Sequence, residues 1–515
     1  MVRSLESVRA YGNAIIIISL ATYFFVIPFG TLISALREPG LYTGEMSPFL
    51  YRWHRQLSQR FEPWALARVD SNRASSLSLN DISGTEWPIF SAVFYLWSTE
   101  ALQDAWEDDP SLYSEMPGAY ARGAIEAAAS LTADPKQAAW VKEHWGDDYL
   151  YQENIFYRML LISGLTSYQK LLGDERYERL LRDQVESLST ELDNSPFGLL
   201  DDYPGQCYPI DILPAIAAVK RADEVLVTDH TEFVDRALRA FADTRLDART
   251  GLPAYVANSK TGTGIGPARG VGISYMLIWA PELWPEVAQD WTRRYENHFW
   301  QEGWMVAGIR EFSRDSTFDE WLIDVDAGPV VAGYGTAASA FGIGASRKNG
   351  RLDLAYPLSA EALVTAWPLG SGTLLGARML SNLSDAPYIG ESILLFNFTR
   401  EPNAKSIVIE KGRLPFVVYL GMSVYVLIGS LSIGLAIRSL KRWQKQSSAR
   451  YDPEPGFQLI IWIGLTLAGM VILVLNKPFL GILFLLAAQL FRGSRTSAKR
   501  RLGHETSGQW GVSNE

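Results

Sequence analysis

The chain has a single cysteine, Cys207, and only five histidines among its 515 residues. One cysteine excludes an intramolecular disulfide and a cysteine-built zinc site. The histidines are scattered without HExxH or similar spacing, so the sequence predicts no metal site and no cofactor. A basic excess is also absent, since the net charge is −10, and this argues against a nucleic-acid partner.

Strand-like patterns are sparse as well, whereas long uncharged runs are prominent. A bilayer is crossed by about 20 apolar residues. The first run is too long for the core of a signal peptide and has no clear cleavage site, so it predicts an uncleaved anchor. The last run is short, and it forms either a tight hairpin with the third or a partly interfacial segment. The four expected membrane helices are 14–36, 414–437, 457–475 and 478–491.

Lysine and arginine cluster before the first run, after the second and after the fourth. Because basic residues mark the cytoplasmic side, this pattern predicts a multi-pass membrane protein with both termini cytoplasmic and the lipid bilayer as a partner. The main domain is then extracytoplasmic, either periplasmic or extracellular. The expected parts are a 1–36 anchor, a 37–411 main domain, a 412–440 membrane helix, a 441–456 basic loop, a 457–492 membrane hairpin and a 493–515 basic tail.

Helical patterns dominate the main domain, and they come in pairs. The first helix of each pair is apolar and aromatic, and the second is amphipathic, as a solvent-facing helix should be. Five or six such pairs predict an all-α fold of the (α/α)6 toroid or barrel type; an irregular all-α bundle is the competing interpretation. The first helices of the pairs start near Trp87, Tyr151, Pro209, Gly272 and Ala327.

Each of these first helices follows a polar or glycine-rich loop. Inner helices of a toroid run in the same direction, so the loops should converge on one rim, where helix N-termini favour polar or anionic ligands. Paired carboxylates there can act as general acid and as base or nucleophile, although aspartate at a helix start is also a common cap. A lone cysteine is either a reactive group or a buried filler. The candidate catalytic residues are Glu86, Glu153, Asp202, Cys207 and Asp211.

A second set of residues is suited to binding a substrate at the same rim. Tyrosine rings can stack on a flat ligand or fill the core, and an arginine can hold an anionic group or join an exposed ion-pair cluster. The candidates are Asp81, Tyr95, Tyr203, Tyr208, Tyr275, Arg310 and Asp326.

Three segments within about 81–380 resemble the linalool dehydratase/isomerase-like catalytic domain, an α/α barrel: ENIFYRMLLISGLTSYQKLLGDERY, YPGQCYPIDILPAI and DVDAGPVVAGYGTAASAFGIGAS. The resemblance implies addition or removal of water at a prenyl alcohol. Cys207 resembles the first of the two pocket cysteines of that family, and Asp81 or Glu86 its acidic residue before the first inner helix. Glu153 stands near the position of a family histidine, and the second cysteine is missing.

Three functions follow as hypotheses. A carboxylate-rich rim outside a membrane favours a glycoside hydrolase or lyase with a glycan substrate, because α/α toroids commonly serve such enzymes. The first alternative is a hydro-lyase or isomerase acting on a small apolar alcohol. The second is a non-catalytic subunit of a membrane assembly. The oligomeric state is left open.

Overall fold

The structure, a computed structural model, describes residues 2–446 except 72, 79–80, 244–245 and 319, together with isolated positions between 461 and 488. The described chain is mostly helical, as predicted. It divides into two compact units, residues 22–429 and residues 1–21 with 430–515.

The helices are α1 (Val2–Ala21), α2 (Ile27–Arg37), α3 (Gly40–Thr43), α4 (Pro48–Asp70), α5 (Arg73–Ser76), α6 (Ile82–Thr85), α7 (Trp87–Asp108), α8 (Pro117–Tyr120), α9 (Arg122–Ala133), α10 (Ala139–Trp145), α11 (Ile155–Leu172), α12 (Glu178–Asn194), α13 (Pro209–Leu226), α14 (Thr231–Asp243), α15 (Gly270–Leu283), α16 (Pro285–Phe299), α17 (Thr336–Lys348), α18 (Leu352–Ala366), α19 (Leu375–Ser381), α20 (Ile389–Phe398) and α21 (Phe416–Gln446). A π-helical turn, Thr22–Val26, joins α1 to α2.

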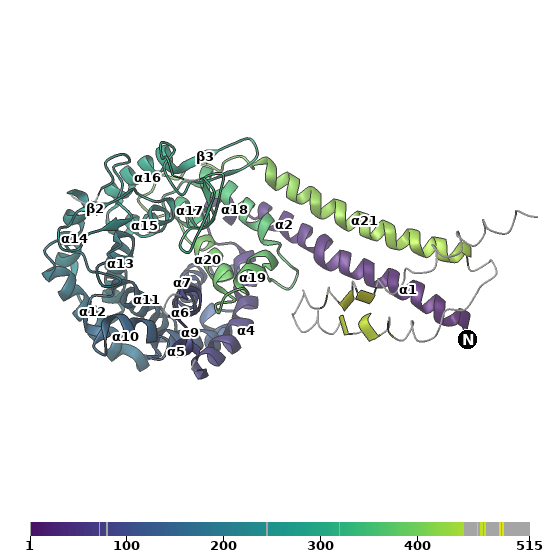
Figure 1. Ribbon diagram of the computed structural model, residues 1–515, viewed down its shortest axis with the longest axis horizontal. Coiled ribbons are helices and arrows are strands. Elements are labelled where there is room, and N and C mark those ends of the chain that lie inside the picture. Colours follow the sequence, from purple (N-terminus) through teal and green to yellow (C-terminus); the bar gives the residue numbers. More distant parts are fainter. Residues whose placement is uncertain are drawn as a thin grey trace, which may run out of the picture. The chain divides into compact units, whose positions relative to one another are not determined.

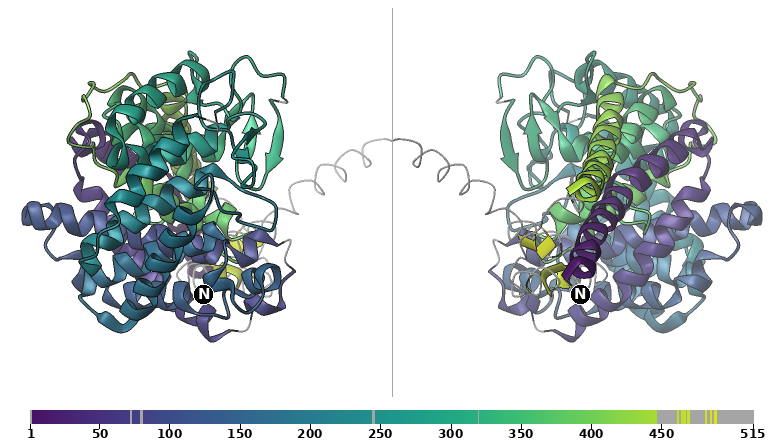
Figure 2. Two further views of the ribbon diagram at one scale, coloured as in Figure 1. Left: turned by 90° about the vertical axis from the view of Figure 1, so that its left-hand side faces the viewer. Right: turned by 90° about the vertical axis from the view of Figure 1, so that its right-hand side faces the viewer.

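Short strands form three antiparallel sheets, β1–β2, β3–β4 and β5–β6–β7. Most of them gather on one side of the helical body of residues 22–429 (Figure 2). Their bounds are β1 (Val256–Ala257), β2 (Gly264–Ile265), β3 (Trp300–Glu302), β4 (Ala307–Ile309), β5 (Leu322–Asp324), β6 (Gly328–Val331) and β7 (Tyr334–Gly335).

Six helices of the larger unit are neighbours in a closed sequence of contacts. Helix α7 packs on α11, α11 on α13, α13 on α15, α15 on α17, α17 on α20, and α20 returns to α7. Figure 1 shows these helices around a common centre. Their composition explains the placement, because a helix that is apolar on every face must be buried on every face. Nearly all of α15, for example, is buried.

A second set of helices packs against the outside of the first. Helix α9 contacts α7 and α11, α12 contacts α11 and α13, α14 contacts α13, α16 contacts α15, and α18 contacts α17. In α12 the leucines and valine of one face are buried at helical spacing, while the charged residues of the other face stay in solvent. The predicted pairing of an apolar with an amphipathic helix therefore holds for α11 with α12, α13 with α14 and α15 with α16. It is wrong for the last pair. The helix expected near Ala327 begins only at Thr336, after β6 and β7, and its partner α18 is mostly buried.

Two helices of this arrangement were not predicted. Helix α4 packs on α9 and α20, and the ten-residue α20 completes the contact sequence of the first set. The start of α4 carries a clear local signal, since Ser47 accepts a hydrogen bond from Phe49 N–H at 3.2 Å and Pro48 occupies the first helical position. Helix α20 is too short for its periodicity to be decisive.

Two stretches of the described residues are long and apolar enough to span a membrane, Tyr11–Arg37 and Phe416–Lys441. Four such helices were predicted. The other two, 457–475 and 478–491, lie almost entirely outside the described residues. Within the smaller unit, the ring of Tyr11 meets Trp443 edge-on, with 5.7 Å between centroids.

A buried carboxylate joins three helices of the first set. Glu100 of α7 accepts hydrogen bonds from Ser167 of α11 at 2.6 Å, Lys170 of α11 at 3.1 Å and Arg221 of α13 at 2.5 Å. Burial alone would raise the pKa of Glu100, but the two cations outweigh it and lower that pKa to about 2. Glu100 therefore stabilises the fold as an anion.

The variant Glu100→Gln should lower the free energy of unfolding by roughly 3 kcal/mol at pH 7, because it leaves two cations without their buried partner. A carboxyl group with a depressed pKa stabilises the fold above its unfolded-state pKa of about 4.3 and loses this effect as the pH falls toward about 2. The difference between variant and wild type should therefore shrink toward pH 2. Denaturant unfolding in detergent measures it, with the exposed Glu143→Gln as control; equal stability of the two variants at pH 7 would contradict the prediction.

Candidate functional site

The segment that contains the cysteine is fastened by a buried carboxylate, Asp202. One oxygen of Asp202 accepts the N–H of Phe156 at 3.0 Å, and the other accepts the N–H of Tyr208 at 3.0 Å. These two N–H groups belong to the beginnings of α11 and α13, where backbone donors lack helical partners. Asp202 thus holds the entrances of two neighbouring helices together.

Glu153 supports the same segment through a hydrogen bond to its backbone. Its carboxylate accepts the N–H of Asp201 at 2.6 Å, and burial is the main cause that raises its pKa. The charged groups acting on Glu153 are Asp201, Glu191 and Lys260. In the structure, Glu153 therefore holds the backbone of the segment in place.

Glu86 stands directly before α7 and accepts a hydrogen bond from the hydroxyl of Tyr203. Burial raises the pKa of Glu86 to about 7; the hydrogen bond from Tyr203 opposes this shift, and the carboxylate of Asp326 adds to it. The Tyr203 hydroxyl keeps its proton, because burial and Glu86 raise its pKa far above neutrality. Near neutral pH, Glu86 is therefore present both as an acid and as an anion.

Asp211 lies in the first turn of α13 and interacts with two other carboxyl groups. Burial, followed by the charges of Asp326 and Glu86, raises the pKa of Asp211 well above its usual range. Burial and Asp211 in turn raise the pKa of Asp202. Four acidic groups from three segments that are far apart in the sequence, around Glu86, Asp202–Asp211 and Asp326, are thus close enough to affect one another's protonation.

Two residues of this region, Tyr255 and Arg269, were not predicted. The Tyr255 hydroxyl donates to Asp326 at 2.8 Å, and the Arg269 guanidinium lies over the Tyr255 ring at 4.5 Å. Arg269 also pairs with Glu311 at 2.6 Å and Asp324 at 3.1 Å. Arg269 is the one charged residue in the glycine-rich stretch 261–272, which is a usable signal, whereas Tyr255 has no comparable signal.

Tyr208 and Tyr275 bring further hydroxyl groups to the same place. The Tyr208 ring meets Tyr255 edge-on at 5.6 Å, and Tyr275 lies close enough to Asp211 for that charge to raise its pKa. Tyr275 is buried, and its hydroxyl has no well-formed hydrogen bond among the described residues, although Trp279 lies beside it. Because an unsatisfied buried hydroxyl is costly, this group favours a polar ligand.

These residues form what we call the carboxylate–tyrosine cluster: Glu86, Asp202, Tyr203, Tyr208, Asp211, Tyr255, Tyr275 and Asp326. Exposure increases across it, since Asp202 is buried, Glu86 and Asp211 are half-buried, and Asp326 is exposed. The cluster therefore meets solvent at Asp326. It combines exchangeable protons with hydrogen-bonding hydroxyls, which is what general acid–base chemistry requires.

Three predicted binding residues lie away from the cluster. Asp81 caps the short helix α6 by accepting Gly84 N–H at 3.1 Å. Tyr95 is fully buried and donates to Ser58 at 2.7 Å. Arg310 pairs with Glu320 at 2.8 Å near β4.

Cys207 lies in the predicted segment between Asp202 and Tyr208, but its side chain is fully buried within the hydrophobic core. Its carbonyl oxygen accepts the N–H of Ala257 at 2.9 Å, which ties the segment to β1. This packing is compatible with the filler role that the sequence left open.

Within the part of the chain that the structure describes, no three His, Cys, Asp or Glu side chains are grouped so that they could hold a metal ion. No family model matches this chain, and no curated protein sequence matches it. The resemblance to linalool dehydratase/isomerase-like domains stays a prediction.

The raised pKa of Glu86 makes the stability of the protein depend on pH in a defined direction. A carboxyl group that is harder to ionise when folded stabilises the fold below its unfolded-state pKa of about 4.3, and this effect is lost as pH rises through about 7. Glu86→Gln should therefore match the wild type near pH 4 and be more stable by up to about 3 kcal/mol at pH 8. Denaturant unfolding at the two pH values tests this, with Glu143→Gln as control; a variant less stable than wild type at pH 8 would contradict it.

Proposed function

We propose that the chain is a membrane-anchored, extracytoplasmic enzyme that cleaves glycans by acid–base catalysis at the carboxylate–tyrosine cluster. The observation that carries this proposal is the pairing of Glu86 with Tyr203, in reach of the charges of Asp211 and Asp326. Cleavage of a glycosidic bond requires one protonated carboxyl group and one ionised carboxylate, separated by their environments.

The packing of the helices supports an (α/α)6 toroid as the scaffold. Six apolar helices contact one another in a closed sequence, and a second helix lies outside each of them or between two of them. The inner helices α7, α11, α13 and α15 begin next to members of the cluster or to Arg269. Such a scaffold brings loops that are far apart in sequence to one rim.

Within the cluster, Glu86 is suited to be the general acid and Asp326 the base. Glu86 is half protonated near neutral pH and gives its proton to the glycosidic oxygen as the bond to the anomeric carbon breaks. Asp326 is the most exposed carboxyl group of the cluster. Burial raises its pKa, and the hydrogen bond from Tyr255 and the charge of Arg269 oppose this shift and favour the ionised form. Asp326 takes a proton from the water molecule whose oxygen bonds to that carbon.

The polarity of the cluster favours a sugar over an apolar alcohol. Four tyrosines surround four carboxyl groups, and exposed aromatic rings lie nearby. Phe312 stacks on Phe318 at 4.5 Å and also lies beneath Arg269 at 5.7 Å. Phe318 is 52% exposed, and an exposed ring of this kind can stack on a sugar face. The position of Cys207 in the cluster segment, between Asp202 and Tyr208, is the observation that keeps a hydro-lyase or isomerase as second candidate.

Membrane anchoring is supported by the two apolar helical stretches, which flank the larger part of the chain. Arg438 and Lys441 stand at the end of the second stretch, as expected at a cytoplasmic boundary. Residues 37–411 then face the outside, where a glycan substrate would be met.

Glu86→Gln should reduce glycan cleavage at least a hundredfold, because it removes the only proton this residue can supply. A panel of neutral and uronic-acid-containing glycans provides the substrate, and an ultraviolet-absorbing unsaturated product distinguishes a lyase from a hydrolase. Glu361→Gln is the matched control, since burial also raises the pKa of Glu361 to about 7 while its partner is Ala307 N–H. Glu153→Gln should also stay active, because the amide oxygen can still accept Asp201 N–H.

Full activity of Glu86→Gln on the best substrate would remove the cluster from the mechanism. If no glycan is cleaved, dehydration of a tertiary prenyl alcohol by the same protein, with loss of activity in Cys207→Ser, would instead establish the second candidate.

Tyr203→Phe should shift the pH profile of the reaction to higher pH. A general acid must be protonated, so kcat/KM falls as pH rises past the pKa of Glu86. The hydrogen bond from Tyr203 lowers that pKa, and its removal should raise the pKa above about 7. Measuring kcat/KM against pH tests this. If the fall in kcat/KM at alkaline pH stays in place or moves to lower pH, Tyr203 does not lower the pKa of the general acid.

A further inference from the structure

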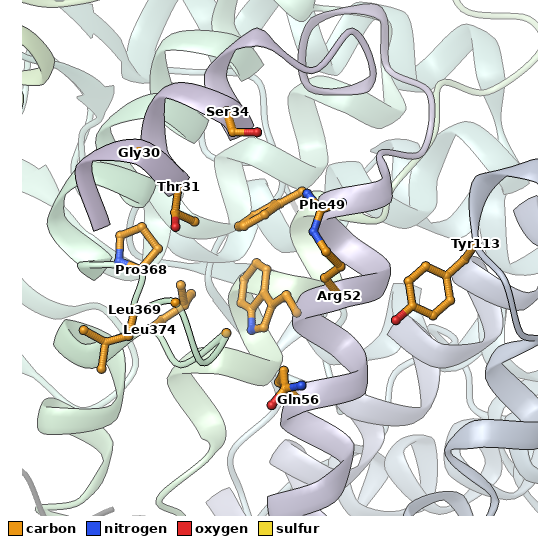
Figure 3. Close-up of a pocket in the computed structure, with 13 residues that line it drawn as sticks. Gly30, Thr31, Ser34, Phe49, Arg52, Gln56, Tyr113, Pro368, Leu369 and Leu374 are labelled. Atoms are coloured by element: carbon orange, nitrogen blue, oxygen red, sulfur yellow. The ribbon is translucent and has the colours of Figure 1, made fainter. Parts of the chain in front are cut away.

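A cavity of about 550 Å³ lies between α2, α4 and the loop of residues 368–374, with none of the cluster residues in its wall (Figure 3). Its volume is in the range of small-ligand sites. Figure 3 shows Thr31 of α2 and Phe49 of α4 facing the space between the two helices.

Each helix contributes one face to the wall. Helix α2 contributes Gly30, Thr31 and Ser34, which are small or hydroxyl-bearing residues within an otherwise apolar stretch. Small and polar residues on such a helix mark the face that meets something other than lipid chains. Helix α4 contributes Phe49, Arg52, Trp53 and Gln56, whose spacing of three or four residues places them on one face.

The third wall is the loop of residues 368–374, whose glycines allow it to pack closely against α2 and α4. A Cβ atom at Gly370 would lie 2.6 Å from the side chain of Ile27. Gly372 has φ +76°, and a Cβ atom there would lie 2.7 Å from Gln56. Both glycines therefore let the loop close against α2 and α4 while the cavity stays open beside it.

The wall is rich in hydrogen-bond donors and contains no acidic side chain. Arg52 is half exposed and uses one nitrogen to pair with Glu38 at 2.8 Å, which leaves other guanidinium donors available. Thr31, Ser34 and Tyr113 add three hydroxyl groups to the wall. A guanidinium together with hydroxyl groups is complementary to a phosphate group.

The position of the cavity along α2 indicates where the ligand would come from. Gly30, Thr31 and Ser34 lie within seven residues of Arg37, where the apolar stretch Tyr11–Arg37 ends. At 1.5 Å per residue, Ser34 lies about 5 Å and Gly30 about 10 Å from that end, so this face extends from the headgroup layer into the adjoining hydrocarbon. Just before this face, Val26 and Ile27 are 46% and 38% exposed and offer an apolar path for a chain.

We propose that this cavity binds the phosphate headgroup of a membrane lipid, whose hydrocarbon chain lies along the exposed apolar side of α2. The proposal rests on the membrane anchoring proposed above, and it is independent of the acid–base chemistry at the cluster. Arg52 and the hydroxyls of Thr31 and Ser34 are the groups that recognise the phosphate.

The test measures binding of three probes to the full chain in non-ionic detergent by native mass spectrometry. Dioleoyl phosphatidic acid carries both phosphate and chains, dioleoylglycerol carries only the chains, and glycerol 1-phosphate carries only the phosphate. We expect the first to bind at least tenfold more tightly than either of the others. Equal binding of dioleoylglycerol would overturn the role of the phosphate, and equal binding of glycerol 1-phosphate would indicate a site for a soluble phosphate and overturn the lipid.

Arg52→Gln should weaken binding of phosphatidic acid about tenfold. Arg73→Gln is the matched control, because Arg73 is 55% exposed and pairs with Asp385 much as the 52% exposed Arg52 pairs with Glu38. Equal weakening in both variants would show non-specific charge attraction and overturn the site. Ser34→Trp should block the cavity, and unchanged binding in this variant would place the lipid elsewhere. Glu86→Gln should bind like the wild type, so that a failure of the proposed catalysis is distinguished from a failure of this site.

Discussion

The bridge made by Asp202 is the contact on which the proposed site depends. A single buried carboxylate accepts the N–H groups of Phe156 and Tyr208 and so joins the beginnings of α11 and α13. Helix beginnings carry unpaired N–H groups and partial positive charge, so a carboxylate is the natural partner. Once the two entrances are joined, Tyr203 reaches Glu86 at the start of α7, and Asp211 comes near both Glu86 and Asp326.

Crowding of acidic groups then determines the chemistry. Arg269 lies over the ring of Tyr255 in the cluster, but it is engaged by Glu311 and Asp324 and does not neutralise Glu86 or Asp211. Buried carboxyl groups with mutual repulsion and few cations hold their protons up to higher pH. The contrast with Glu100 is instructive, because there Lys170 and Arg221 overcome burial and keep the carboxylate ionised. One fold therefore contains a carboxylate that stabilises the structure and carboxyl groups that can exchange protons.

The cavity beside α2 differs from the cluster in its chemistry and in its location. Its polar groups are donors, and it stands at the end of an apolar helix, whereas the cluster lies at the entrances of the central helices. If both proposals hold, the protein would bind a membrane phosphate near its anchor and carry out acid–base chemistry at a separate site.

Much of the helical order was predictable from local patterns. The apolar and amphipathic alternation identified α7, α11, α13 and α15 with their outer partners, because periodicity is a property of neighbouring residues. It placed the start of α17 near Ala327 instead of Thr336, because the short strands β6 and β7 are too brief to show a period of their own. The same reasoning missed α4 and α20, and it placed Tyr95 in the site although its side chain faces Ser58 in the core.

The sequence by itself determined which segments are apolar helices, which loops carry acids and tyrosines, and that the chain holds one cysteine. Only the tertiary structure decided that Glu86 accepts a hydrogen bond from Tyr203, that Tyr255 donates one to Asp326, and that Glu153 accepts the N–H of Asp201. The physical reason is that protonation and hydrogen bonding depend on distances between residues that are tens to more than a hundred positions apart, and such distances are set by how the helices pack.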